Sequence, residues 1–155
     1  MDTVTTPGAM VLLTRLSRVV YRQATEQQLG IRLKQYIALN YLRDQGPTPQ
    51  QELGEALHLD PNNLVLLLND LEDESYVERR RDTSDRRRHI VEITRAGVQA
   101  LERAERALES VEDEVLAALS AEERATLRRL LVQAMEGVTG SVGEPAVAAT
   151  KRRSA

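Results

Sequence analysis

Two closely spaced helix-start signals in the middle of the chain restrict its fold more than any other feature. Thr48-Pro49 and Asp60-Pro61 each combine a side chain that caps helix N-termini with a proline, which is favoured at the first helical position. Gln51 stands where a capping box places its second polar side chain. We therefore predict two short helices, over residues 48–59 and 61–73, joined by a tight connection as in a helix-turn-helix.

Hydrophobic periodicity and further cap signals extend this pattern on both sides. The other expected elements are helices over residues 9–28 and 32–44, hairpin strands over 76–81 and 88–93, and helices over 95–119 and 121–138. Thr94 and Ser120 are the expected caps of the last two helices, with Glu123 completing a capping box at Ser120. Core-facing stripes are expected at Gln35, Ala38, Leu39 and Leu42, and at Leu64, Leu67, Leu68 and Leu71.

The formal net charge of −3 conceals segments of opposite sign. Residues 46–75 hold seven acidic side chains and no Lys or Arg, whereas residues 76–95 hold seven arginines and four acids. A planar guanidinium suits phosphate groups and narrow minor grooves, so a basic hairpin directly after a helix-turn-helix favours a nucleic-acid contact. The alternative is a solvated turn in which Asp82 and Asp85 neutralise the arginines beside them.

Several other classes of function are disfavoured by what the sequence lacks. There is no Cys, so a disulfide, a thiolate metal site and a cysteine redox switch are excluded, and two distant His cannot form a zinc site unaided. No glycine-rich phosphate loop or nucleophile elbow is present, so we expect neither an enzyme nor a cofactor nor a bound metal. Asp2 and Arg15 bracket the first apolar stretch, which is typical of neither a signal peptide nor a spanning helix; we expect a cytoplasmic protein without a membrane partner.

From about Leu12 to Ala134, the order of elements resembles the MarR family of bacterial transcription regulators. The most specific segment is Leu71-Glu72 through Tyr76-Val77-Glu78-Arg79 and Asp85-Arg86-Arg87 to Ile93-Thr94-Arg95-Ala96-Gly97, which is similar to the family pattern L-E, G-L-V-x-R, D-x-R and L-T-x-x-G. The resemblance implies a mainly α fold with a small β-hairpin wing, a winged helix-turn-helix with long N- and C-terminal dimerisation helices. It implies dimerisation helices at 1–30 and 95–138, a DNA-binding lobe at 31–94 and a flexible tail at 139–155.

The resemblance also implies a homodimer that binds a pseudo-palindromic operator in double-stranded DNA. The implied wing contacts are Arg79, Arg81, Asp85, Arg86, Arg87 and Arg88; the recognition-helix contacts are Asn62, Asn63, Val65, Leu66 and Asn69; the phosphate contacts are Thr48, Gln50 and Asp60; and the dimer contacts are Leu12, Leu16, Leu108, Val111, Val115, Leu130 and Ala134. Asn can pair with adenine and Val or Leu can touch a thymine methyl, so an A·T-leaning half-site is one hypothesis, and packing of Val65 and Leu66 against the wing is the other.

The resemblance further implies a repressor of a nearby operator that is released by a small phenolic or aromatic acid. Arg15, Tyr36 and Asn40 are the candidate ligand contacts; alternatively, Arg15 pairs with an acid across the dimer and Tyr36 only packs. A different class of function is an interaction protein that binds another regulator through its acidic recognition helix. Ser75 replaces the glycine that the family prefers, so we expect a turn without a positive φ angle there.

Overall fold

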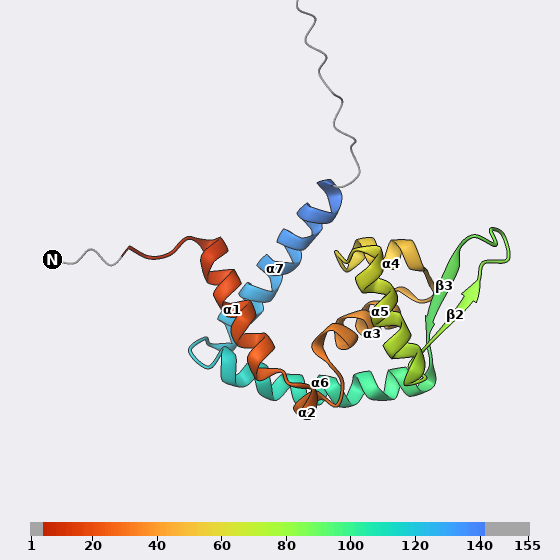
Figure 1. Cartoon of the computed structure of the whole chain (residues 1–155). Helices are drawn as coiled ribbons and strands as arrows, with labels where there is room; N and C mark the ends of the chain where they lie inside the picture. Colours follow the sequence, from red (N-terminus) through yellow and green to blue (C-terminus); the bar gives the residue numbers. More distant parts are fainter. Residues whose placement is uncertain (1–4, 142–155) are drawn as a thin grey trace, which may run out of the picture. The chain divides into compact units, whose positions relative to one another are not determined.

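The structure is a computed structural model that describes residues 5–141, and it falls into two units divided between Ala117 and Ala118. The first unit contains, in chain order, α1 (Ala9–Gln23), α2 (Glu26–Leu29), α3 (Leu33–Gln45), β1 (Thr48–Pro49), α4 (Gln50–Ala56), α5 (Pro61–Asp73), β2 (Val77–Arg81), β3 (His89–Ile93) and α6 (Arg95–Val115) (Figure 1). The second unit contains α7 (Ala121–Ser141). The tail expected at 139–155 therefore begins inside α7, and its residues 142–155 lie outside the described part of the chain.

The core of the first unit is almost entirely aliphatic. Both predicted stripes are confirmed, because Gln35, Ala38, Leu39 and Leu42 of α3 and Leu64, Leu67, Leu68 and Leu71 of α5 are the buried residues of those helices. They pack with Leu53 of α4 and Leu101 of α6 in one cluster. Full burial of a leucine side chain contributes about 1.5–3 kcal/mol to folding, so this cluster fixes how the short helices lie against one another.

The three strands form an antiparallel sheet in the order β1-β3-β2. Val77 pairs with Ile93 at one end of the hairpin and Arg81 pairs with His89 at the other. Val77 and Val91 are buried in the core, which anchors the root of the hairpin, while the turn over residues 82–88 extends away from the helices (Figure 1). The predicted wing is therefore present, with its strands within one residue of the expected bounds.

The helix expected over residues 9–28 is wrong in its extent, because α1 ends at Gln23. The hydroxyl oxygen of Thr25 accepts a hydrogen bond from the Gln28 backbone N–H and so starts α2 separately. Gly30, at φ 79°, then ends α2 in the left-handed conformation that glycine adopts without strain. The helix expected to reach residue 119 likewise ends earlier, at Val115.

Three of the four predicted helix caps are confirmed. Asp60 accepts from the Asn63 N–H, Thr94 accepts from the Gly97 N–H, and Ser120 forms a reciprocal capping box with Glu123. The prediction for Thr48 is wrong, because this residue pairs with Val91 in the sheet and its hydroxyl donates to the Gly46 carbonyl. Pro49 occupies the cap position of α4 with no side-chain hydrogen bond, and no capping box forms there.

The turn between α5 and β2 contradicts the expectation for Ser75, whose φ angle is +61°. The Ser75 N–H donates to the Glu72 carbonyl and the Tyr76 N–H donates to the Leu71 carbonyl, at 2.9 Å each. These two bonds form a Schellman motif, in which the residue after the helix must be left-handed. The hydrogen bonds of the turn therefore set the sign of φ, whichever residue occupies the position.

We predict that Ser75→Gly raises the free energy of unfolding by about 0.5–1 kcal/mol, because glycine removes the left-handed strain at the cost of some unfolded-state entropy. Urea denaturation measures this change. Ser75→Ala is the matched control, since it keeps a Cβ at the strained position and should give no gain. Equal stabilisation by both variants would contradict the assignment of strain to this residue.

Candidate nucleic-acid interface

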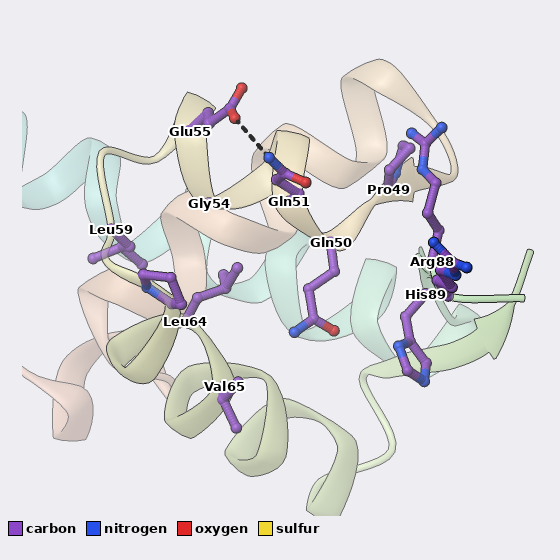
Figure 2. A pocket seen from close by; sticks show the side chains of 12 residues that line it. Pro49, Gln50, Gln51, Gly54, Glu55, Leu59, Leu64, Val65, Arg88 and His89 are labelled. Atoms are coloured by element: carbon purple, nitrogen blue, oxygen red, sulfur yellow. Dashed lines mark hydrogen bonds between the residues drawn. The ribbon is translucent and has the colours of Figure 1, made fainter. Parts of the chain in front are cut away.

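A groove of about 490 Å³ lies where α4, the start of α5 and the start of β3 meet (Figure 2). Its lining residues are Pro49, Gln50, Gln51, Gly54, Glu55, Leu59, Pro61, Leu64, Val65, Arg87, Arg88 and His89. In Figure 2, Gln50 extends from α4 toward α5, and Arg88, just before β3, and His89, the first residue of β3, lie at the far side of the groove. The groove thus joins the helix-turn-helix to the tip end of β3 on one face of the first unit.

The outward face of α5 carries all five predicted recognition residues, Asn62, Asn63, Val65, Leu66 and Asn69, in exposed positions. Leu66 is 62% exposed, which is unusual for a leucine and rules out its burial against the wing in this chain. Two of the asparagines already have side-chain partners, since the Asn63 amide donates to the Asp60 carboxylate and the Asn69 amide oxygen accepts from Arg79. Within residues 5–141, Asn62 is the asparagine of this face with no side-chain hydrogen bond.

The two aspartates of the wing tip bind the turn itself. Asp82 accepts from the backbone N–H and the hydroxyl of Ser84, and the backbone hydrogen bond is the main reason that the pKa of Asp82 lies below its usual value. Asp85 Oδ1 accepts from the Arg87 backbone N–H at 3.0 Å. Neither aspartate has an ion pair with an arginine in the described chain. Arg81, Arg86 and Arg87 are exposed, and none of the three has an ion pair with any described residue.

Three other arginines pair with carboxylates of the acidic helix-turn-helix. Arg32, the N-cap of α3, lies 2.5 Å from Asp70. Arg88 lies 3.4 Å from Glu52 of α4, and Arg79 lies 3.0 Å from Glu72 of α5. Each pair joins an acid of residues 46–75 to a cation outside that segment. The sequence gives no direct sign of the first two pairs, because Arg32 is 38 residues from Asp70 and Arg88 is 36 residues from Glu52.

The predicted phosphate contacts and one wing contact need correction. Thr48 is only 5% exposed and its hydroxyl is engaged, so it is not available to a phosphate. Asp60 places its own carboxylate at the N-terminus of α5, where the hydrogen bond from the Asn63 N–H is the main cause that lowers its pKa. Gln50 remains, half-buried in the groove. Arg79 points to α5 and not outward, with a side chain only 19% exposed.

The candidate ligand residues do not line this groove. Arg15 is exposed on α1. Tyr36 is half-buried against the core, and burial is the main cause that raises the pKa of its hydroxyl. The Asn40 amide oxygen accepts from Arg43, whose guanidinium also binds Glu105 of α6 at 2.5 Å. Tyr36 and Asn40 therefore lie beside an ion pair between α3 and α6.

The candidate dimer residues differ in how much the chain itself covers them. Val111 is 5% exposed within the core of the first unit, and Leu108 and Val115 pack against that core, so α6 already uses these side chains. Leu12 on α1 and Leu130 and Ala134 on α7 are exposed, and Leu16 is half-exposed.

The described residues form neither a metal site nor a membrane-spanning helix. No group of three or more His, Asp or Glu in the described chain is arranged to hold a metal ion. None of the helices between residues 5 and 141 has both the length and the apolar character that crossing a bilayer requires.

Comparison with known proteins identifies relatives of this architecture. The model of the MarR family matches residues 31–89. A putative transcriptional regulatory protein for the hcr operon of Thauera aromatica is 38% identical over 82 residues, 53% of this chain and 49% of that protein, so the chain spans about half the length of this relative. The HTH-type transcriptional repressor NicR of Pseudomonas putida is 30% identical over 117 residues, which cover 76% of this chain and 73% of NicR.

Solved structures share the same fold. A crystal structure of MarR superposes with a TM-score of 0.78 at 25% identity, covering 94% of this chain and 99% of that one. A mutant MarR from E. coli complexed with operator DNA gives a TM-score of 0.65 at 25% identity, covering 81% of this chain and 89% of that one. The winged helix-turn-helix, the arginine-bearing wing and the extent of these matches lead to one conclusion: the chain belongs to the MarR family of transcriptional regulators.

Proposed function

We propose that this protein is a homodimeric, sequence-specific DNA-binding repressor that recognises a pseudo-palindromic operator near its own gene. The observation that carries the proposal is the set of unpaired arginines Arg81, Arg86 and Arg87 on a wing whose turn is held by its own aspartates. Because the backbone of this turn is already fixed, binding of phosphate or entry into a minor groove costs the turn little backbone freedom. The similarity to a MarR variant solved with operator DNA supports this assignment.

The recognition helix contributes sequence discrimination rather than attraction. The Asn62 amide has no hydrogen-bond partner within the described chain and can pair with a base edge, and the exposed Val65 and Leu66 can contact thymine methyl groups. We therefore assign the major groove to this face of α5 and an A·T-leaning half-site to its chemistry. The lobe over residues 31–94 performs the binding.

Dimerisation and ligand release complete the proposal. Helices within 1–30 and 95–138 form the dimer, which the exposed apolar side chains Met10, Val11 and Leu12 of α1 and Leu130 and Leu131 of α7 support. The repressor role is supported by the similarity to NicR, which is named a repressor. For the small aromatic or phenolic acid we assign Tyr36, Asn40 and Arg15, because the half-buried Tyr36 hydroxyl lies near the charged Arg43–Glu105 pair.

We predict that Arg87→Ala lowers affinity for a DNA fragment from upstream of the protein's own gene by about 10-fold or more, because a charge-assisted hydrogen bond contributes about 1.5–3 kcal/mol. Fluorescence anisotropy at several salt concentrations should also show a less negative slope of log K against log salt. The slope should change by about 0.9 for each phosphate that the variant no longer neutralises.

Arg103→Ala is the control for this variant, since Arg103 is an exposed arginine on α6 that lies outside the wing and the groove. Unchanged affinity of Arg87→Ala would show that the wing does not bind DNA. Binding of a protein partner, with no retardation of the DNA by the wild type, would instead favour an interaction protein.

We predict that Glu52→Gln raises DNA affinity a few-fold. This change removes a carboxylate beside the groove and releases Arg88, which lies 3.4 Å from Glu52 and is then free for a phosphate. The salt slope should become steeper by up to about 0.9 per released arginine. Glu109→Gln is the control. It removes one negative charge from an exposed position on α6, outside the helix-turn-helix, and should change DNA affinity less than Glu52→Gln does. A fall in affinity for Glu52→Gln would contradict competition between Glu52 and phosphate.

A further inference from the structure

Arg79 of the wing binds two side chains of α5, Glu72 and Asn69. It stands in the middle of β2, and its guanidinium reaches across to the C-terminal half of α5. There Nε donates to Glu72 Oε2 at 3.0 Å, one terminal nitrogen donates to Glu72 Oε1 at 3.2 Å, and the same nitrogen donates to Asn69 Oδ1 at 2.6 Å. Two donors on one carboxylate form the forked pair that fixes both position and orientation.

The electrostatics match this geometry. The hydrogen bonds from Arg79 hold the pKa of Glu72 below its usual value, so this contact favours the ionised form of the Glu72 carboxylate. The Arg79 side chain is 19% exposed, whereas the Arg88 side chain, which bears a looser pair, is 47% exposed. A phosphate could reach Nε or the bonded terminal nitrogen of this guanidinium only by displacing Glu72 or Asn69.

The pair spans the connection that sets the angle between α5 and the wing. Glu72 lies just before the Schellman turn at Ser75, and Arg79 lies just after it. Both side chains line a hollow that also includes Val65 of the recognition face and His89 of β3. A rigid link at this point limits how far the wing can move relative to α5.

The contact also determines the chemistry that Asn69 can offer. An arginine only donates hydrogen bonds, so the atom of the Asn69 amide that faces Arg79 must be the oxygen. The amide NH₂ group then points away from Arg79 as a donor. Bidentate pairing with adenine would have to use the second lone pair of the oxygen that Arg79 already holds, whereas the NH₂ group alone suits an acceptor such as guanine N7 or O6, adenine N7 or thymine O4.

We infer that Arg79 is a positioning residue and not a DNA contact: with Glu72 it fixes the wing against the recognition helix, and through Asn69 Oδ1 it makes Asn69 a hydrogen-bond donor toward the DNA. The inference rests on the proposed DNA-binding function. It assigns Arg79 a role different from those of Arg81, Arg86 and Arg87, although all four belong to the same basic hairpin.

The sharpest test is Glu72→Gln, because it separates two opposite outcomes. If Arg79 bound phosphate and Glu72 competed for it, removal of the negative charge would raise DNA affinity and steepen the salt slope. A positioning role predicts the reverse, a loss of affinity of about 10-fold, as expected for one charge-assisted hydrogen bond, with the salt slope unchanged. Arg79→Gln should give the same loss and the same unchanged slope, and the double variant should lose little more than either single variant.

Two measurements without DNA distinguish failure of this inference from failure of the proposed function. Urea unfolding of the wild type, the two single variants and the double variant should reveal a coupling between Glu72 and Arg79. Hydrogen exchange of the β2 and β3 amides should become faster in Glu72→Gln, while Glu52→Gln serves as the control that leaves this link intact. Higher affinity of Glu72→Gln, or no coupling and unchanged exchange, would overturn the positioning role; absence of DNA binding by the wild type would contradict the proposed function instead.

Discussion

Arginine–carboxylate pairs between the helix-turn-helix and the rest of the lobe are the interaction on which the proposed DNA surface depends. Residues 46–75 contain seven acids and no Lys or Arg, a composition that would repel a phosphate backbone. Arg32, Arg79 and Arg88 neutralise three of these acids from outside the segment. Exposed ion pairs stabilise a fold by only about 0–1 kcal/mol each, so the main effect of the exposed Arg32 and Arg88 pairs is on the potential that an approaching polyanion meets, whereas the less exposed Arg79 pair fixes the wing.

The position of the wing follows from short contacts around the end of α5. The turn at Ser75 directs the chain from α5 into β2, and the Thr94 hydroxyl donates to the Ser75 carbonyl at 2.6 Å. A Cβ built on Gly97, the third residue of α6, would lie 2.2 Å from the Tyr76 carbonyl oxygen, so the start of α6 can pack here only with glycine at this position. Recognition helix, wing and long helix therefore meet at one junction, and Arg79 extends that junction to the side chains.

The sequence predicted the caps and stripes that follow from local spacing, but it missed the contacts with distant partners and one local turn at which the residue type was misleading. The caps at Asp60, Thr94 and Ser120 join residues three apart, and the stripes of α3 and α5 follow from helical period, so both are visible in the sequence. Thr48 looked like a cap but pairs with Val91 in the sheet. Ser75 adopts a positive φ because the hydrogen bonds of its turn require it. The partner of Arg79 could not be predicted, because it depends on the angle between a helix and a strand.

The most direct test of the central claim is the salt dependence of DNA binding by the wild-type protein. With three unpaired wing arginines in each of two wings, the slope of log K against log salt should be about −5 for a fragment from upstream of the gene, at −0.9 per phosphate contact. This value counts the wing arginines alone, because Arg32, Arg79 and Arg88 are already paired with acids of the helix-turn-helix. A slope near zero would contradict the account, because association would then not involve the phosphate backbone.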